Sequence, residues 1–196
     1  MLKRIFDIFF SLTGLIILMP FLLIVALLVK ITSPGPVFYS GFRIGQNEKM
    51  FRCIKFRSMK VNNDDFAITV GERDPRITTF GIIIRKLKID ELPQLWNVLV
   101  GDMTFVGPRP DTSKYRHYYK AAYPDYYKHR PGITSPSSIY FIDESEIYVG
   151  KSDPEKIYIE ETIPKKVELD MVYFKHVSVL TDIKYIFITI YKIFKR

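Results

Sequence analysis

The sequence predicts an α/β protein that is mostly α-helical, with a membrane helix over residues 1–32 and one small domain over residues 33–196. Three observations support this class. An uncharged apolar run covers residues 8–29, two short stretches with the pattern of a β-hairpin follow before residue 60, and apolar residues then recur at helical spacing. At 196 residues, the chain is long enough for one domain to bury a core without disulfides.

The composition indicates anionic partners. Lysine and arginine exceed aspartate and glutamate by eight, which favours nucleic acid, anionic lipid headgroups or nucleotide diphosphates as ligands. The single cysteine, Cys53, excludes an internal disulfide and a cysteine-rich zinc site, and its apolar surroundings predict a small buried side chain. The three histidines lack metal-ligand spacing, so we interpret them as structural or surface residues.

The apolar run is predicted to enter a membrane. Its 22 residues would form a helix of about 33 Å, which is enough for a bilayer. The run is too long for a cleavable signal peptide and no cleavage site follows it. Its large apolar residues cover every face, unlike those of a helix in a soluble core.

Proline and charge together predict how this helix sits in the membrane. Pro20 lies near its middle, where proline removes a backbone hydrogen bond and bends or breaks a helix. Lys3 and Arg4 precede the run and Lys30 follows it, so the positive-inside tendency draws both ends to the cytoplasm. We therefore expect a re-entrant helix broken at Pro20, with a simple span as the alternative. Asp7 is expected to pair with Arg4 at the headgroup boundary, where a lipid phosphate would dock.

Turn residues and periodicity outline the domain. The Ser-Pro-Gly-Pro stretch at residues 33–36 ends the membrane helix. The predicted elements are strands at 37–40 and 49–59 around a turn at 45–48, helices at 77–87 and 92–99, a tyrosine-rich helix near an interface at 114–128, and an acidic, loop-like segment with a short helix at 143–158. Within the second helix, one apolar face is predicted, made of Leu92, Leu95, Trp96 and Leu99.

The C-terminal segment, residues 177–196, is predicted to be an amphipathic helix. On a helical wheel one side carries apolar and aromatic residues, and the other carries Lys184, Lys192, Lys195 and Arg196. A basic amphipathic helix with aromatic residues is typical of a membrane interface, and an ordinary surface helix packed on the core is the alternative.

Two adjacent carboxylates, Asp90 and Glu91, are the leading candidates for chemistry. They stand at the predicted start of a helix, where acidic residues also serve as caps, so capping is an alternative explanation. Arg109 follows between two prolines, which fix its backbone. A carboxylate pair beside a fixed guanidinium fits a phosphate ester with a divalent cation shared by acid and phosphate. Further cations extend the pattern to an anion site: Lys55, Arg57, Arg85 and Arg130.

Several longer stretches carry a family resemblance. They are KRIFD, SPGPVF, KFRSM, DPRIT, DELPQLWNVLVGDMTFVGPRP, RPGIT and ELDMVYFKHVSVLTDIKYI, and together they cover nearly the whole chain. Through them the chain resembles bacterial sugar transferases of the monotopic phosphoglycosyl transferase family. The resemblance implies transfer of a phospho-sugar from a UDP-sugar to undecaprenyl phosphate with release of UMP. This reaction would initiate assembly of an exopolysaccharide, capsule, O-antigen or glycoprotein glycan.

The resemblance also implies roles for single residues. Asp90 would be the nucleophile that gives a covalent phosphosugar-aspartyl enzyme, and Glu91 would join it in holding Mg²⁺. The substrate site would then comprise the cations named above together with Asp170, that is, Lys55, Arg57, Arg85, Arg109, Arg130 and Asp170. The phosphate of the lipid acceptor is assigned to residues near the membrane surface, Lys3, Arg4 and Asp7.

Two departures from the family pattern leave details open. The family's helix break is commonly Ser-Pro, whereas here it is Met19-Pro20. After RPGIT, many members continue with glycine, a bulky apolar residue and glutamine. Here residues 135–139 differ and an acidic insertion, residues 143–161, follows, so the sugar and nucleobase contacts are not predicted.

The expected location is the cytoplasmic face of the bacterial inner membrane, with the chain monotopic. Expected partners are a UDP-sugar, undecaprenyl phosphate, anionic lipids and downstream glycosyltransferases of the same pathway; a homodimer is left open, and no nucleic-acid partner is expected. Two other functions stay open. A basic membrane-surface binding module would give Asp90 and Glu91 no role, and a lipid-phosphate hydrolase would release inorganic phosphate in place of UMP.

Overall fold

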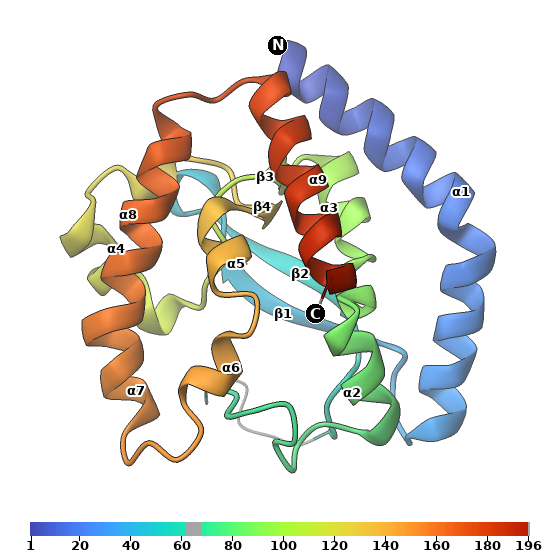
Figure 1. Ribbon diagram of the computed structural model, residues 1–196. Coiled ribbons are helices and arrows are strands. Elements are labelled where there is room, and N and C mark those ends of the chain that lie inside the picture. The colour runs from blue at the N-terminus through green and yellow to red at the C-terminus, as the bar shows by residue number, and fades with distance from the viewer. Residues whose placement is uncertain (62–67, 196) are drawn as a thin grey trace.

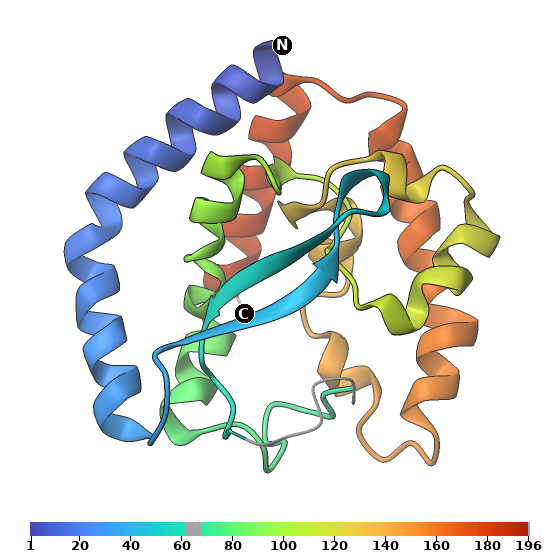
Figure 2. The ribbon, with the colours of Figure 1, turned by 180° about the vertical axis from the view of Figure 1, so that it is seen from behind.

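Helices surround a short β-hairpin in this chain, which confirms the predicted class, α/β and mostly α (Figure 1). The computed structural model describes residues 1–61 and 68–195. Helices α1 and α8 lie at opposite sides of the hairpin, while α9 lies in front of it in Figure 1 and behind it in Figure 2. The hairpin is therefore the central element against which the other parts are positioned.

The predicted membrane helix is α1 (Leu2–Thr32), which is long and apolar enough to cross a membrane by length and composition. The break predicted at Pro20 is corrected to a curve in one continuous helix, because the helix runs without interruption through this residue. Figures 1 and 2 show α1 curving round the side of the domain. One hydrogen bond lost at a proline bends a helix without ending it when the turns on either side stay intact.

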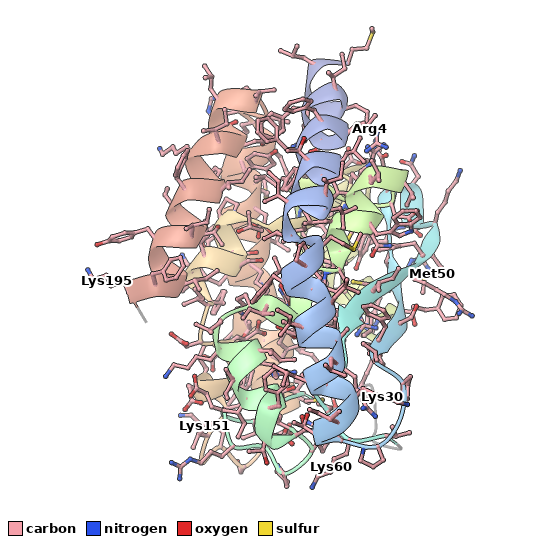
Figure 3. All side chains as sticks on the ribbon, turned by 90° about the vertical axis from the view of Figure 1, so that its right-hand side faces the viewer. Arg4, Lys30, Met50, Lys60, Lys151 and Lys195 are labelled. Carbon is pink, nitrogen blue, oxygen red and sulfur yellow. The ribbon has the colours of Figure 1, made fainter. Side chains whose placement is uncertain are left out.

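Both ends of α1 dock on the domain, and Figure 3 shows Arg4 at one end and Lys30 at the other. Arg4 Nη1 donates to the Val98 carbonyl at 2.6 Å. Near the other end, Val29 packs against Phe56 in a buried apolar cluster. Many side chains between the ends are large, apolar and exposed, including Ile5, Phe9, Leu12, Ile16, Ile17, Leu23, Ile24, Leu27 and Ile31.

The predicted β-hairpin is present as β1 (Phe38–Ile44) paired antiparallel with β2 (Met50–Phe56). Cys53 on β2 is buried, as predicted. The sequence does not predict the second pair, in which β3 (Thr104–Val106) lies parallel to β4 (Gly132–Thr134). Each of these strands has three residues, which is too short for the alternation that identifies a strand.

Two helices follow where the sequence predicts them, α2 (Thr79–Lys86) and α3 (Gln94–Val100), joined through a 3-10 turn at Ile89–Glu91. The predicted apolar face of α3 is confirmed for Leu95, which is buried, and wrong for Trp96, which is 52% exposed, while Asn97 is buried instead. The Asn97 amide oxygen and nitrogen both hydrogen-bond to the backbone of β2. These bonds hold a polar residue on the buried face and leave Trp96 pointing outward.

The C-terminal half is built from short helices followed by two longer ones, α8 and α9. Its helices are α4 (Arg116–Ala122), α5 (Pro136–Tyr140), α6 (Glu144–Ile147), α7 (Pro154–Ile157), α8 (Ile163–Phe174) and α9 (Val179–Lys195). It also contains 3-10 turns at Ser113–Tyr115 and Tyr126–Lys128 and a π-helical turn at Tyr158–Thr162, while a further 3-10 turn, Gln46–Glu48, joins the strands of the hairpin. The short helix predicted in the acidic segment is confirmed by α6 and α7.

Tyrosines form the largest buried cluster in this half. The segment predicted to lie near an interface instead contributes Tyr115, Tyr119, Tyr126 and Tyr127 to this core. Some of their hydroxyls are hydrogen-bonded, as between Tyr119 and Tyr158 at 3.1 Å, whereas those of Tyr115 and Tyr127 have no partner among the residues described. On α9, by contrast, aromatic and apolar side chains stay exposed, in agreement with an amphipathic helix. Arg196, assigned to its polar side, lies outside the described residues.

Candidate active site

A cavity of about 910 Å³ opens between the hairpin, α2, α6 and α9. Basic and acidic side chains line it around the turn at Ile89–Glu91, and Ile186, Ile190 and Ile193 of α9 form an apolar wall. Asp90 and Glu91 both lie on its wall. A large concave site with convergent polar groups and an apolar side is typical of ligand binding.

The backbone places the two carboxylates at the junction of α2 and α3. Lys88 has a positive φ of 55°, which ends α2 and turns the chain into the segment that contains Asp90 and Glu91. Neither acid caps α3, since its N-cap is Pro93 and no side-chain hydrogen bond is made there. Helix capping therefore does not explain the pair.

Glu91 is held between two cations. Its Oε1 atom accepts hydrogen bonds from Lys55 Nζ at 2.7 Å and from Arg109 Nη2 at 2.8 Å, and its side chain is 8% exposed. Burial alone would raise the pKa of Glu91, but Arg109 and Lys55 hold it well below its usual range. The charge of Glu91 in turn raises the pKa of Arg109. Glu91 is therefore a stable anion that keeps two basic side chains on the cavity wall.

Asp90 differs from its neighbour although the two are adjacent in sequence. Its side chain is buried, and its Oδ1 atom has no hydrogen-bond partner among the residues that the structure describes. Burial, and then the negative charge of Glu91, raise the pKa of Asp90 against the opposing charge of Lys55. A buried carboxylate oxygen without a partner is costly, so it favours a cation or an electrophilic centre that engages it.

Apart from Arg57, the structure brings three of the predicted cations to the same cavity as the acids, namely Lys55, Arg85 and Arg109. Sequence reasoning missed a fourth, Lys88, whose pKa is lowered by burial. Its position two residues before Asp90 is a signal that was available in the sequence. Four basic side chains around two acids leave an excess of positive charge, which suits a phosphate or diphosphate.

Two predicted substrate-binding residues have other contacts. Arg57 lies on the cavity wall, but its guanidinium donates to the carbonyl oxygens of Ser33, at 2.7 Å, and of Pro34. Asp170 is fully buried away from the cavity lining, where it accepts hydrogen bonds from Ser137 and Tyr126. Both contact sets are structural, because Arg57 fastens the end of α1 and Asp170 fixes the start of α5. We therefore propose structural roles for both residues in place of the substrate-binding roles predicted from the sequence.

The predicted acceptor residues lie apart from Asp90, in a smaller cavity of about 270 Å³ that Arg130 also lines. The predicted pair between Asp7 and Arg4 is wrong: Asp7 accepts from the Thr104 hydroxyl at 2.8 Å, and Arg4 donates to carbonyl groups of α3. Lys3 pairs with a fully buried acid of α9, Asp182, which sequence reasoning missed. These contacts hold the N-terminal end of α1 on the domain, and Arg130 is not brought to the acid pair.

The two carboxylates are also the candidates for holding a metal. Among the residues that the structure describes, no group of three or more His, Cys, Asp and Glu side chains could form a metal site. Magnesium is commonly held by one or two carboxylates together with substrate phosphates. Asp90, with its unpartnered oxygen, and Glu91 fit such an arrangement.

The chain is similar to sugar transferases along its whole length. The family model described as "Bacterial sugar transferase" matches residues 1–196. An Escherichia coli (strain K12) protein named UDP-glucose:undecaprenyl-phosphate glucose-1-phosphate transferase is 38% identical over 98% of this chain and 40% of its own length. The exopolysaccharide production protein PSS of Rhizobium leguminosarum bv. phaseoli is 40% identical over 96% of this chain and 93% of its own length.

A third relative has a different sugar in its name. The UDP-N-acetylgalactosamine-undecaprenyl-phosphate N-acetylgalactosaminephosphotransferase of Aeromonas hydrophila is 36% identical over 96% of this chain and 43% of its own length. The chain thus spans less than half of the Escherichia coli and Aeromonas proteins but most of the Rhizobium protein.

Proposed function

Because the chain belongs to the bacterial sugar transferase family, we propose that it transfers a phospho-sugar from a UDP-sugar to undecaprenyl phosphate. The products are UMP and an undecaprenyl diphosphate sugar. The names of the Escherichia coli and Aeromonas relatives, both of which specify undecaprenyl phosphate, support this acceptor. The observation that carries the proposal is the unpartnered oxygen of Asp90 beside a charge-neutralised Glu91 on the wall of a basic cavity.

In the first step, Asp90 attacks the phosphorus next to the sugar. A bond forms between a carboxylate oxygen and this phosphorus, and the bond from phosphorus to the bridging oxygen breaks, so that UMP leaves with the electron pair. Lys55, Arg85 and Arg109 bind the diphosphate oxygens and reduce the repulsion between the two anions. Glu91 keeps Lys55 and Arg109 in position for this task.

In the second step, an oxygen of undecaprenyl phosphate attacks the same phosphorus and releases Asp90. The apolar wall that α9 contributes gives the prenyl chain a surface to follow into the cavity. Two steps at one carboxylate allow the soluble donor and the lipid acceptor to use one site in turn. Mg²⁺ is the proposed cofactor, held by Asp90 and Glu91 with the donor phosphates; when bound, it supplies positive charge to the phosphate oxygens.

We also propose that both ends of α1 lie on the cytoplasmic face of the membrane. Lys3 and Arg4 fasten one end to the domain, and Arg57 fastens the other. A straight helix of 31 residues would be about 46 Å long, and a span would carry one end away from the domain and break its contacts. Labelling of a cysteine placed at the N-terminus tests this: reaction from the periplasmic side would show a spanning helix.

The reaction is tested by incubating the detergent-solubilised protein with a panel of UDP-sugars, Mg²⁺ and undecaprenyl phosphate, and measuring UMP. We expect UMP from at least one donor, and none from Asp90→Asn. Asp125→Asn, which makes the same chemical change at an exposed ion pair outside the cavity, should behave like the wild type. Inorganic phosphate released without acceptor would indicate the hydrolase, and ligand binding without UMP from any donor would indicate the binding module.

A further inference from the structure

The acidic insertion, residues 143–161, forms part of the wall of the cavity that contains Asp90. Glu144 at the start of α6 and Lys166 on α8 both line this cavity. Lys166 Nζ donates to Glu144 Oε1 at 2.8 Å, and the two side chains are 4% and 25% exposed, respectively. Burial alone would raise the pKa of Glu144, but the charges of Lys166 and Arg109 hold it below its usual value. Glu144 is therefore held as an anion, within electrostatic reach of Arg109 in the proposed phosphate site.

Aromatic hydroxyls surround this ion pair on the same cavity wall. Tyr148 donates to Glu144 Oε1 at 3.1 Å. Lys166 Nζ lies 3.5 Å from the Tyr158 hydroxyl and 4.7 Å from the centre of its ring. The Tyr158 hydroxyl donates to Asp111 Oδ2 at 2.9 Å. All five side chains line the cavity, so they form one polar and aromatic patch in the cavity that the apolar residues of α9 also line.

A purely structural role explains this patch poorly. A buried ion pair contributes little net stability, since the cost of removing two charges from water offsets their attraction, and apolar residues of similar size often serve as well. Unlike Arg57, this pair makes no side-chain hydrogen bond to the backbone among the residues described. The hydrogen bonds that described residues make to the Glu144 carboxylate all reach Oε1, and none reaches Oε2. One carboxylate oxygen is thus left for a ligand.

The chemistry of the patch matches a ring that carries neighbouring hydroxyl groups. A carboxylate oxygen accepts hydrogen bonds from hydroxyls, and an ammonium group donates to their oxygens. Tyrosine rings offer an apolar surface to the C–H face of such a ring and a hydroxyl to its edge. A phosphate, by comparison, would be repelled by Glu144 and Asp111. The patch therefore complements the basic cations around Asp90, since a nucleotide sugar contains both phosphates and hydroxyl-bearing rings.

We propose that Glu144 and Lys166 form a subsite for a hydroxyl-bearing ring of the donor and so help to select that donor. This inference rests on the proposed function, because it takes a nucleotide sugar as the ligand. The ring is either the transferred sugar or the ribose of the nucleotide, and the two have the same hydrogen-bonding chemistry. Glu144 and Lys166 are here positioning and selectivity residues, and they take no part in bond making.

The test measures binding, without turnover, of UDP, 2′-deoxy-UDP, UDP-glucose, UDP-galactose and their N-acetylamino forms to the full chain by titration calorimetry. Glu144→Gln keeps the shape of the side chain and removes its charge. Glu155→Gln is the matched control. Glu155 belongs to the same insertion but lies outside the cavity, where it forms an exposed ion pair with Lys114. Loss of one charged hydrogen bond should weaken binding of the preferred donor about 10- to 100-fold, with no change for the control.

The pattern of the loss identifies the ring. A loss for UDP-sugars with UDP unchanged assigns the subsite to the transferred sugar. An equal loss for UDP and UDP-sugars, together with a smaller preference for UDP over 2′-deoxy-UDP, assigns it to ribose. If Glu144→Gln does not fold, Tyr148→Phe takes its place. It removes one hydrogen bond to Glu144 Oε1 without changing the charge, and it should weaken binding of the same ligands.

The inference is overturned if folded Glu144→Gln, or folded Tyr148→Phe in its place, binds every ligand within twofold of the wild type. Failure of the proposed reaction looks different. A wild-type protein that binds UDP-sugars but releases no UMP would refute the transferase chemistry, while the effect of Glu144→Gln on binding would still support the subsite. A wild-type protein that binds neither UDP nor any UDP-sugar would refute both.

Discussion

Arg57 allows a structural role and a binding role to be separated. Its Nη2 atom donates to the Ser33 carbonyl at 2.7 Å and to the Ser33 hydroxyl at 2.9 Å, and Nη1 donates to the Pro34 carbonyl. Arg57→Met keeps the apolar stem and removes these three bonds, together with a longer one from Nη2 to the Val29 carbonyl at 3.5 Å. Each charged hydrogen bond contributes about 1.5–3 kcal/mol, but water replaces the bond at exposed Pro34. The free energy of unfolding should therefore fall by about 3–5 kcal/mol.

Thermal unfolding in a fixed detergent measures this loss. For a chain of this size, 1 kcal/mol corresponds to about 2–4 °C, so Arg57→Met should lower Tm by about 6–20 °C. Arg52→Met is the control on the same strand. Among the residues described, the exposed Arg52 side chain makes only a cation–π contact, with Phe42 at 5.1 Å, which contributes about 0.5–1 kcal/mol. Below its Tm, Arg57→Met should bind UDP-sugars as the wild type does. An unchanged Tm with weakened UDP-sugar binding would refute this reasoning and restore the role predicted from the sequence.

Two further predictions concern Asp170 and α9. Burial raises the pKa of Asp170 from 3.8 to about 6, so the protonated folded form is favoured and stability falls as pH rises from about 4 to 6. In Asp170→Asn, the decrease in the free energy of unfolding between pH 4 and pH 6 should be smaller than in the wild type by about 2–3 kcal/mol, as measured by urea unfolding at both pH values. An equal decrease in the variant and the wild type would contradict the prediction. On α9, the side chain of Phe187 is 68% exposed. If α9 lies in the membrane interface, Phe187→Cys in nanodiscs of anionic lipid should react with a water-soluble maleimide about tenfold more slowly than the control Glu168→Cys on α8. The native Cys53 is buried and should not react. Equal rates would show that α9 faces water.

Local signals account for the parts of the fold that the sequence predicts. The long apolar run, the hairpin turn and the acid pair are each visible within a few residues, and the structure contains all three. Asp182 shows why the rest is hidden. It is a single acid on an apolar helix, and only the packing of α9 against α1 reveals that it pairs with Lys3. The lysine consequently holds α1 to the domain, although its position beside a membrane segment predicts a lipid contact.

The difference between Asp90 and Glu91 is likewise set by contacts distant in sequence. Lys55, on β2, and Arg109, from a proline-flanked loop, both reach Glu91 Oε1, and neither makes a hydrogen bond to Asp90. Glu91, which receives the two cations, stays ionised, while burial and then the negative charge of Glu91 raise the pKa of Asp90. The carboxylate with the higher pKa is the more basic, and basicity favours attack on phosphorus once the cations of the site engage the donor phosphates. Tertiary structure thus gives Glu91 both basic side chains and leaves Asp90, the proposed nucleophile, with an unpartnered oxygen. Two neighbouring letters in the sequence do not contain this distinction.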